Sequence, residues 1–176
     1  DLIATLSRLT SDQRNLVFII SGRERKQLAK WFAAVPNLGL AAEGGCFIRW
    51  PERVRKRYGN TKESVWDTSD EIQHTYPPVW KNDIRGVLRA YTERTDGSYI
   101  EEKEASISWH YDAADPQFGA TQAAELHRYI ARITDMENLE IREYKQRSKI
   151  LSVEPKGVNK GSTVRSILQK IAADGK

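Results

Sequence analysis

The fold class follows from Leu16-Val17-Phe18-Ile19-Ile20-Ser21-Gly22-Arg23 and from what surrounds it. Its apolar run predicts a strand buried on both faces, as in a parallel sheet. The run ends at Ser21-Gly22-Arg23, and a charged stretch that favours a helix follows at 24–32. Ligands of open α/β sheets bind at the carboxyl ends of strands, and a hydroxyl with backbone N–H groups at a helix start suits phosphate. Ser-Gly is also common in plain turns, so an ordinary strand-to-helix turn is the alternative.

The segments on either side of this stretch extend the same pattern. Leucine and isoleucine recur at helical spacing over 2–9, which predicts an opening helix. Pro36-Asn37 ends the helix at 24–32, and 38–42 then reads as a second buried strand. Extended structure resumes at Phe47-Ile48. The strand–helix–strand order predicts a parallel, right-handed unit.

Residues 51–78 differ from the rest, because they are polar, rich in turn formers and poor in aliphatic residues. We predict a long surface connection there, partly ordered by Trp66, and a domain boundary. A second unit follows, with an apolar helical stripe over 84–91 and a turn at Thr95-Asp96-Gly97-Ser98.

Two strands of a hairpin are predicted at 99–103 and 106–111. Ile107, Trp109 and Tyr111 alternate with polar residues, which predicts one buried face and one solvent-facing one. Further along we predict a helix over 118–133, strands at 139–142 and 150–153, a turn-rich segment at 155–161 and a final amphipathic helix over 164–171.

Composition narrows the function classes. The chain has 176 residues, of which 30% are charged and 39% hydrophobic, as in a globular protein. We expect no membrane partner and no signal peptide, because no apolar run approaches membrane-spanning length and the N-terminus lacks a basic region before an apolar core. Cys46 is the only cysteine, which excludes an intramolecular disulfide and fits a reducing compartment, so we expect a cytoplasmic protein.

Nucleic-acid binding is not expected either. The net charge is only +4, and acidic residues are interspersed among the basic ones. The one basic run, Arg53-Val54-Arg55-Lys56-Arg57, reads as a solvated loop. Cys46 reads as a packing residue, since nothing near it in sequence would lower the pKa of its thiol.

Four stretches, taken together and in order, resemble the trehalose-6-phosphate phosphatase family. They are FIISGR at 18–23, LAAEGGCF at 40–47, EEKEASISWHY at 101–111 and KGVNKG at 156–161. The resemblance extends over about residues 2–173. It is closest to the phosphatase-like domain that follows the synthase domain in two-domain trehalose-phosphate synthase proteins.

The resemblance implies an α/β fold of the haloacid-dehalogenase-like type, with a Rossmann-like core and an inserted, mobile α/β cap. The core would comprise 1–50 and 154–176 and would be incomplete here, the connection would be 51–78, and the cap would be 79–153. The implied activity is dephosphorylation of trehalose-6-phosphate to trehalose in the complete protein, in partnership with a synthase domain.

The resemblance also assigns phosphate-binding roles to two residues. Ser21 would supply the phosphate-binding hydroxyl, and Lys160 would neutralise the phosphate and the nucleophilic carboxylate. Phosphoryl transfer depends on such positioning and charge compensation. The alternatives are that Ser21 only caps a helix and that Lys160 is a solvated lysine at a helix start, where the helix dipole disfavours it unless an anion is bound.

Four further residues would contact the substrate. The resemblance matches Glu101 and Lys103 to cap residues that hold sugar hydroxyls, and it adds Glu43 and Asn159 as substrate-binding residues. At spacing i, i+2 in a strand, Glu101 and Lys103 share one face and can reach one ligand. The alternative is an ordinary ion pair between these two side chains. His110 reads as a structural residue of the solvent-facing side of the sheet.

Two motifs of the family are missing from this sequence. The family uses an Asp-x-Asp motif for the nucleophile and the acid/base, and a later Gly-Asp-Asp-type segment to hold Mg²⁺. Neither is present, and we expect them just before residue 1 and just after residue 176 of the parent chain. Mg²⁺ is therefore expected in the complete domain, with no metal ligand in this chain, and this chain alone cannot form an aspartyl intermediate.

Three positions depart from the family pattern. Gly44 stands where histidine is usual, Asp112 where arginine is usual, and Ser152 where a substrate-facing glutamate is usual. An aspartate near a sugar phosphate adds repulsion where attraction is expected. These departures favour an alternative function, a catalytically inactive domain that senses sugar phosphate or supports a trehalose-phosphate synthase.

Overall fold

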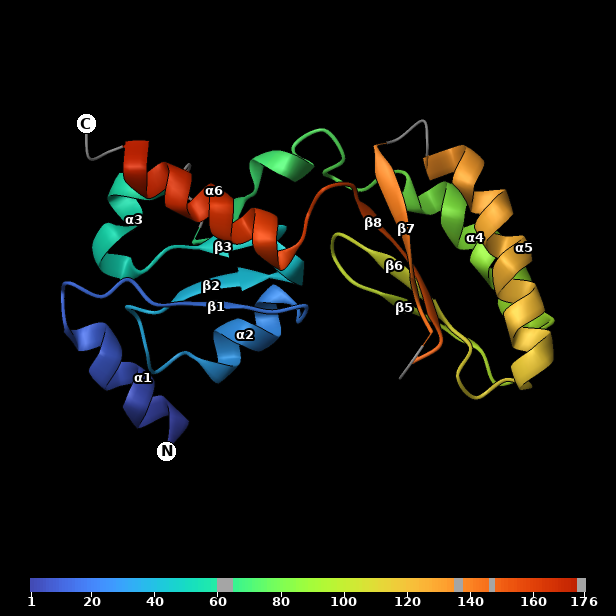
Figure 1. Ribbon diagram of the computed structural model, residues 1–176, viewed down its shortest axis with the longest axis horizontal. Coiled ribbons are helices and arrows are strands. Elements are labelled where there is room, and N and C mark those ends of the chain that lie inside the picture. The colour runs from blue at the N-terminus through green and yellow to red at the C-terminus, as the bar shows by residue number, and fades with distance from the viewer. Residues whose placement is uncertain (60–64, 135–137, 146–147, 174–176) are drawn as a thin grey trace. The chain divides into compact units, whose positions relative to one another are not determined.

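A computed structural model describes residues 1–59, 65–134, 138–145 and 148–173, which fold into two compact units. Unit 1 comprises Asp1–Glu71 and Gly157–Lys176, and unit 2 comprises Ile72–Lys156 (Figure 1). The elements of unit 1 are α1 (Leu2–Ser11), β1 (Phe18–Ile20), α2 (Arg25–Trp31), β2 (Gly39–Ala42), the 3₁₀ turn η1 (Glu43–Gly45), β3 (Phe47–Arg49), α3 (Glu52–Tyr58), β4 (Asp67–Thr68) and α6 (Lys160–Ala173). The turn η2 (Asp70–Ile72) crosses the boundary between the two units in the sequence.

The sheet of unit 1 has the strand order β1-β2-β3-β4. β1 and β2 run parallel, with Phe18 opposite Gly39 and Ile20 opposite Ala41. The predicted parallel strand–helix–strand arrangement is therefore confirmed. β3 and β4 add antiparallel pairs. The result is a mixed sheet. The Ser21 loop follows the carboxyl end of β1, and η1 follows the carboxyl end of β2.

β1 differs from the fully buried strand that its apolar run predicts. Only Phe18–Ile20 form the strand, and all three residues are partly exposed. Among the described strands β1 lies at the end of the sheet order, so it has a strand neighbour on one side only. β2, in contrast, has neighbours on both sides and is buried throughout.

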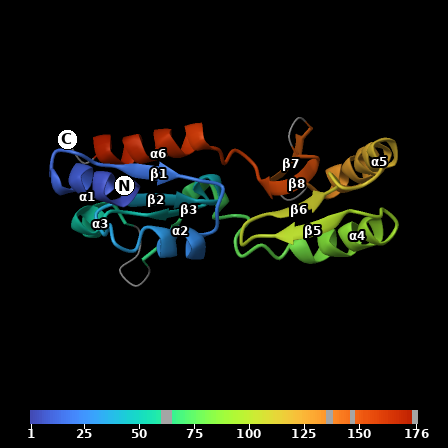
Figure 2. The same ribbon diagram turned by 90° about the horizontal axis from the view of Figure 1, so that it is seen from below.

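Helices cover both faces of this sheet, α6 on one and α2 on the other (Figures 1 and 2). α6 places Ile167 and Ile171 against Ala41, Ile48 and Trp50. Full burial of an aliphatic side chain such as Ile167 contributes roughly 1.5–3 kcal/mol, and the partly buried Ile171 contributes less. This packing fixes the helix whose first residue is Lys160 against the sheet.

The stretch predicted as a surface connection contains more structure than that. Glu52–Tyr58 form α3, in which Val54 and Tyr58, four residues apart, pack on the core beside Trp50. The rings of Trp50 and Tyr58 lie 5.1 Å apart. Val54 and Tyr58 thus anchor an otherwise basic segment on the core of unit 1. Residues 60–64 lie outside the described part.

Unit 2 is an antiparallel sheet with two helices. Its elements are α4 (Lys81–Glu93), β5 (Tyr99–Glu102), β6 (Ile107–His110), α5 (Pro116–Thr134), β7 (Leu139–Tyr144) and β8 (Ile150–Pro155). The strand order is β5-β6-β8-β7, and the predicted hairpin of β5 and β6 is confirmed. α4 and α5 lie on one face of the sheet (Figure 1), where Ile84, Leu88, Trp109, Leu126 and Ile130 form the centre of a core.

The prediction that the polar residues of β6 face solvent is wrong. Ser108 and His110 are buried, as are Ile107 and Trp109. β6 is an inner strand, so neighbouring side chains from β5 and β8 cover its polar side as well. In the described part of the chain, no helix is long and apolar enough to span a bilayer.

Candidate functional site

The loop after β1 is fixed by hydrogen bonds to the end of β2. Ser21 donates its backbone N–H to Ala41 O at 2.9 Å and accepts from the N–H of Gly44 at 2.9 Å. The N–H of Glu43 donates to Arg23 O at 3.0 Å. The Ser21 hydroxyl oxygen accepts the N–H of Arg23 at 3.2 Å. The residue before α2 is Glu24, so the alternative that Ser21 caps this helix is wrong.

The turn η1 has a backbone that suits its glycines. Glu43, Gly44 and Gly45 have φ angles of 48°, 72° and 121°. A side chain at Gly45 is excluded, because its Cβ would lie 1.8 Å from the hydroxyl oxygen of Thr163. Gly44 stands where the family usually has histidine, and glycine adopts its positive φ at little cost. This departure therefore agrees with the local backbone.

Asn159 and Thr163 hold the start of α6. The side-chain oxygen of Asn159 accepts from the N–H groups of Gly161 and Ser162, both at 2.9 Å, as a helix cap does. The hydroxyl oxygen of Thr163 lies 2.8 Å from both Asn159 O and Gly44 O, and its one proton is shared between these two acceptors. Thr163 thus joins the first turn of α6 to η1.

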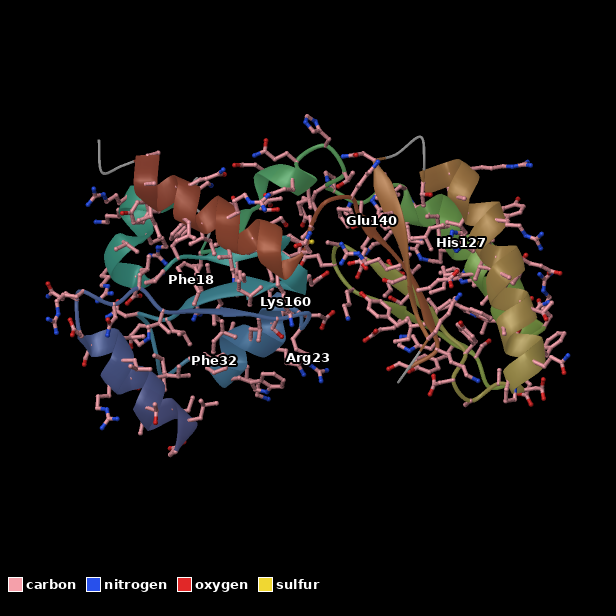
Figure 3. The ribbon with its side chains drawn as sticks, in the orientation of Figure 1. Phe18, Arg23, Phe32, His127, Glu140 and Lys160 are labelled. Atoms are coloured by element: carbon pink, nitrogen blue, oxygen red, sulfur yellow. The ribbon has the colours of Figure 1, made fainter. Side chains whose placement is uncertain are left out.

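These bonds bring four predicted site residues to one end of unit 1. Ser21, Glu43, Asn159 and Lys160 all lie on segments connected through Gly44 and Thr163. Figure 3 shows Lys160 and Arg23 at this end, where β1 and β2 finish. The roles of the four residues toward a substrate stay predictions.

Charge at this end favours an anion. A helix N-terminus carries a partial positive charge. The exposed side chains of Lys160 and Arg23 form no ion pair or side-chain hydrogen bond with any residue in the described ranges. A phosphate group would supply the counter-charge that these cations lack.

In unit 2, Glu101 and Lys103 lie on the face of the sheet away from α4 and α5. Their charged groups are 3.6 Å apart, so they form the ion pair that was the alternative to ligand binding. Glu101 also lies 3.2 Å from His110 Nε2, and His110 stacks on Tyr99 with ring centroids 4.4 Å apart. Both carboxylate and ammonium are partly exposed. The pair therefore remains accessible to a ligand.

A polar row crosses the same face of all four strands. Glu101 lies opposite Ser108, Ser108 opposite Ser152, and Ser152 opposite Arg142. The Ser108 hydroxyl donates to the Ser152 hydroxyl oxygen at 2.9 Å. Ser152, which stands where the family has a glutamate, is thus buried and paired rather than projecting a carboxylate. Asp112, the third departure, is exposed just after Tyr111.

Arg142 is held by two carboxylates on this face, Glu140 and Glu154. Its Nε lies 3.6 Å from Glu154. Burial raises the pKa of the Glu154 carboxyl, and the Arg142 charge opposes that rise only in part. The face therefore alternates acidic and basic groups with hydroxyls, an arrangement suited to the many hydroxyl groups of a sugar.

No metal centre is evident within the described ranges. No group of three or more His, Cys, Asp or Glu side chains there is placed to hold an ion. The residues of this part of the chain do not fit a Mg²⁺ site.

Two residues of the candidate site, Thr163 and Arg142, are not indicated by the sequence pattern. Thr163 lies three residues after Lys160, and only its contact with Gly44, 119 residues away, reveals its role. The sequence pattern places Arg142 in a strand but indicates no role for its side chain. Its register with Ser152 follows from β7 pairing with β8, which the hydrophobic pattern does not specify.

Comparisons with known proteins agree on one family. The family described as trehalose-phosphatase matches residues 1–176. A probable α,α-trehalose-phosphate synthase of Arabidopsis thaliana is 40% identical over 168 residues, which is 96% of this chain and 18% of that protein. The trehalose-phosphatase of Schizosaccharomyces pombe is 35% identical over 174 residues, 98% of this chain and 19% of that protein.

A solved structure adds the fold. The trehalose-6-phosphate phosphatase of Aspergillus fumigatus superposes with a TM-score of 0.63 at 35% identity, covering 96% of this chain and 57% of that one. The chain spans about a fifth of the length of the curated relatives it matches. The predicted haloacid-dehalogenase-like α/β fold is confirmed, and the chain belongs to the trehalose-phosphatase family.

Proposed function

We propose that this chain is the part of a trehalose-6-phosphate phosphatase that binds the phosphate through unit 1 and the sugar through unit 2. The observation that carries the proposal is the joining of the Ser21 loop, η1 and the start of α6 through Thr163 and Gly44. Relatives named for trehalose-phosphate synthase and trehalose-phosphatase support the substrate class.

The residues of unit 1 would act by positioning and charge compensation. The Ser21 hydroxyl donates to a phosphate oxygen, and the Lys160 ammonium balances the charge that spreads over the phosphoryl oxygens. Asn159 keeps the first turn of α6 in shape by its cap bonds. The Asp-x-Asp motif is absent from this sequence, so the nucleophile would come from another part of the complete protein.

The residues of unit 2 would recognise the disaccharide. Glu101 and Lys103 would exchange their mutual ion pair for hydrogen bonds to sugar hydroxyls, with Glu101 kept in place by His110. Mg²⁺ in the complete protein, a synthase domain as partner, and a cytoplasmic location consistent with a single cysteine belong to the same proposal.

Phosphate release by the full-length protein tests this proposal. With trehalose-6-phosphate and Mg²⁺ we expect stoichiometric formation of trehalose and inorganic phosphate. Binding of trehalose-6-phosphate without release would contradict the enzymatic function and favour the sensor or scaffold alternative that Gly44, Asp112 and Ser152 suggested. Release from trehalose-6-phosphate but not from glucose-6-phosphate would locate the specificity in the second sugar ring.

A further inference from the structure

A groove lies between α4 and α5, on the helical side of unit 2, away from the polar sheet face. It has a volume of about 580 Å³ and is lined by Tyr91, Glu125, Arg128, Tyr129, Arg132 and Ile133. This size falls within the range of pockets that hold small organic molecules. The proposed phosphatase function does not use any of these residues.

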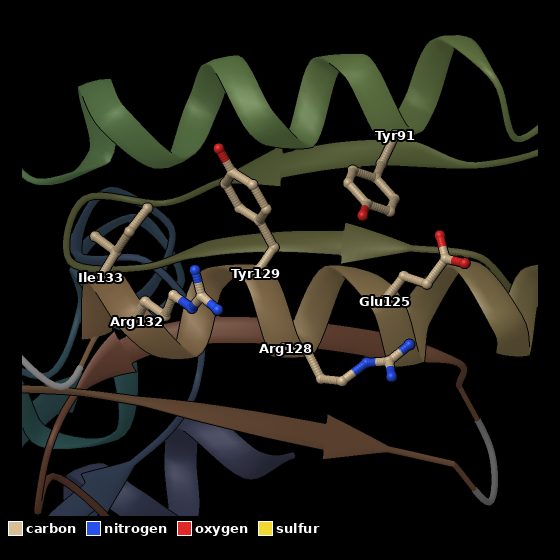
Figure 4. A pocket seen from close by; sticks show the side chains of 6 residues that line it. All are labelled: Tyr91, Glu125, Arg128, Tyr129, Arg132 and Ile133. Carbon is tan, nitrogen blue, oxygen red and sulfur yellow. The ribbon is translucent and has the colours of Figure 1, made fainter.

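Two tyrosine rings form the walls of the groove. Figure 4 shows Tyr91 extending from α4 and Tyr129 from α5 into the space between the two helices. Tyr91 is nearly buried, and the Arg94 guanidinium covers one side of its ring at 3.7 Å. Tyr129 is 58% exposed, so its ring is available to a planar group. Nucleobases stack favourably on aromatic rings of this kind.

Two arginines, Arg128 and Arg132, also line the groove. Arg128 and Arg132 are exposed, and neither forms a hydrogen bond or ion pair with any described residue. They are four residues apart on α5, which places them one turn from each other on one side of the helix. Guanidinium groups bind phosphate oxygens in a bidentate manner. The pair therefore offers charge for one or two phosphate groups.

Glu125, the single acidic residue among the described residues that line the groove, already has partners. Glu125 lies 3.7 Å from Arg94 and accepts a hydrogen bond from Gln122 at 3.4 Å. Arg94 in turn donates to Gln122 at 2.6 Å. Because Arg94 offsets the charge of Glu125, the groove keeps a net positive character from Arg128 and Arg132.

We propose that this groove binds a nucleoside diphosphate, with the base against Tyr129 and the phosphates on Arg128 and Arg132. The chemistry of the groove calls for a ligand that joins a planar ring to a strong anion. A free phosphate would leave the tyrosine rings unused, and a neutral nucleoside would leave the arginines unpaired. The ligand site is separate in sequence from the Ser21 and Lys160 segments and does not rest on the proposed function.

Isothermal titration calorimetry of this chain with ADP, pyrophosphate and adenosine tests the proposal. We expect ADP to bind at least about tenfold more tightly than either of the other two, since each lacks one of the two interactions. Equal affinity for pyrophosphate and ADP would overturn the role of the tyrosines. No heat with ADP at millimolar concentration would overturn the site.

Variants locate the binding. Arg128→Ala combined with Arg132→Ala, and separately Tyr129→Ala, should each weaken ADP binding about tenfold or more. The matched control is Arg89→Ala, which removes another exposed arginine, one on α4 that does not line the groove, and should leave binding unchanged. Lys160→Ala should also leave ADP binding unchanged, which separates the groove from the phosphate site of unit 1. Loss of ADP binding in Lys160→Ala with retention in the double arginine variant would overturn the proposal.

Discussion

Unit 1 and unit 2 keep their shape by different means. Unit 2 is one continuous segment whose sheet buries a large apolar side under two helices, with Trp109 and Leu126 fully inaccessible. Unit 1 is assembled from two distant segments, and its edge strand β1 is only partly buried. The loops of its site are held by individual hydrogen bonds, such as those of Ser21 and Thr163.

The core of unit 2 therefore contributes most to stability, whereas the hydrogen-bonded loops of unit 1 determine the geometry of the site. Substitutions in the core of unit 2 remove apolar burial and should lower the free energy of unfolding most. Substitutions in the loops of unit 1 remove single bonds or add local strain. They should therefore change anion binding more than they change stability.

The largest effect is expected from Trp109→Ala. Trp109 is fully buried, stacks on Tyr111 at 5.1 Å and donates its Nε1–H to the Thr92 hydroxyl at 3.1 Å. Its removal should lower the free energy of unfolding of unit 2 by about 3–5 kcal/mol, measured by urea unfolding followed by circular dichroism. Trp31→Ala, at a site 49% exposed in unit 1, is the matched control and should cost less than about 1 kcal/mol. Equal losses in the free energy of unfolding for the two variants would contradict the claim that the core of unit 2 contributes most to stability.

Gly45→Ala should produce the next largest effect. The new Cβ would overlap the Thr163 hydroxyl, and alanine is strained at a φ of 121°. We expect a loss of about 2–3 kcal/mol in the free energy of unfolding. We also expect loss of phosphate binding by the chain, measured by calorimetry. Gly22→Ala meets nothing within 4 Å, so it should be nearly neutral in both measurements. A Gly45→Ala chain that binds phosphate normally would show that η1 does not shape the site.

Thr163→Val removes the hydroxyl that joins the first turn of α6 to η1, and so tests its effect on stability and on phosphate binding separately. Valine keeps the shape but leaves Gly44 O without the Thr163 hydroxyl, whereas Asn159 O still accepts from the Thr163 N–H and the Ser162 hydroxyl. The change should cost about 1–2 kcal/mol. Thr163→Ser keeps the donor and should restore most of the phosphate affinity that Thr163→Val loses. If serine fails to rescue binding, the methyl group rather than the hydroxyl joins the two loops.

The smallest effect concerns the pH dependence of unit 2. Burial raises the pKa of Glu154 above its ordinary value of 4.5, so its contribution to stability is full below that value and is lost as pH rises through the folded-state pKa. Glu154→Gln should therefore raise the free energy of unfolding at pH 7 by less than about 1 kcal/mol and change nothing at pH 3.

Glu102→Gln is the control of opposite sign. Its pKa is lowered by the Arg85 side chain, so its contribution is present above the ordinary value of 4.5 and is lost as pH falls through the lowered folded-state pKa. This variant should be less stable than the parent chain at pH 7. Chemical unfolding at pH 3 and pH 7 measures the free energy of unfolding of both variants. A change of the same sign at pH 7 in both variants would contradict the opposite pKa shifts of Glu154 and Glu102.

The hydrophobic pattern predicted the strands but not how deeply each strand is buried. The apolar run before Ser21 and the alternation over 106–111 identified strands, because both signals are contained within a few residues. Burial depends on what pairs with a strand. Ser108 and His110 are buried because β6 is an inner strand, and β1 is partly exposed because it is an outer one.

The site was predictable to the extent that its residues occur in recognisable motifs. Ser21 and Lys160 were identified from such stretches, and the structure places their segments together. Thr163 was not identifiable, since its bond to Gly44 joins residues far apart in sequence. The helix α3 was missed because Val54 and Tyr58 give only two apolar positions in a basic segment.

The most direct test of the phosphate site compares two lysines in the full-length protein. Lys160 is the first residue of α6, and Lys156 is an exposed lysine four residues earlier. If Lys160 compensates the charge of the transferred phosphoryl group, Lys160→Ala should reduce the rate of phosphate release from trehalose-6-phosphate by about 100-fold or more, while Lys156→Ala leaves it unchanged. Equal rates in the two variants would contradict the assignment of Lys160 and, with it, the phosphate site of unit 1.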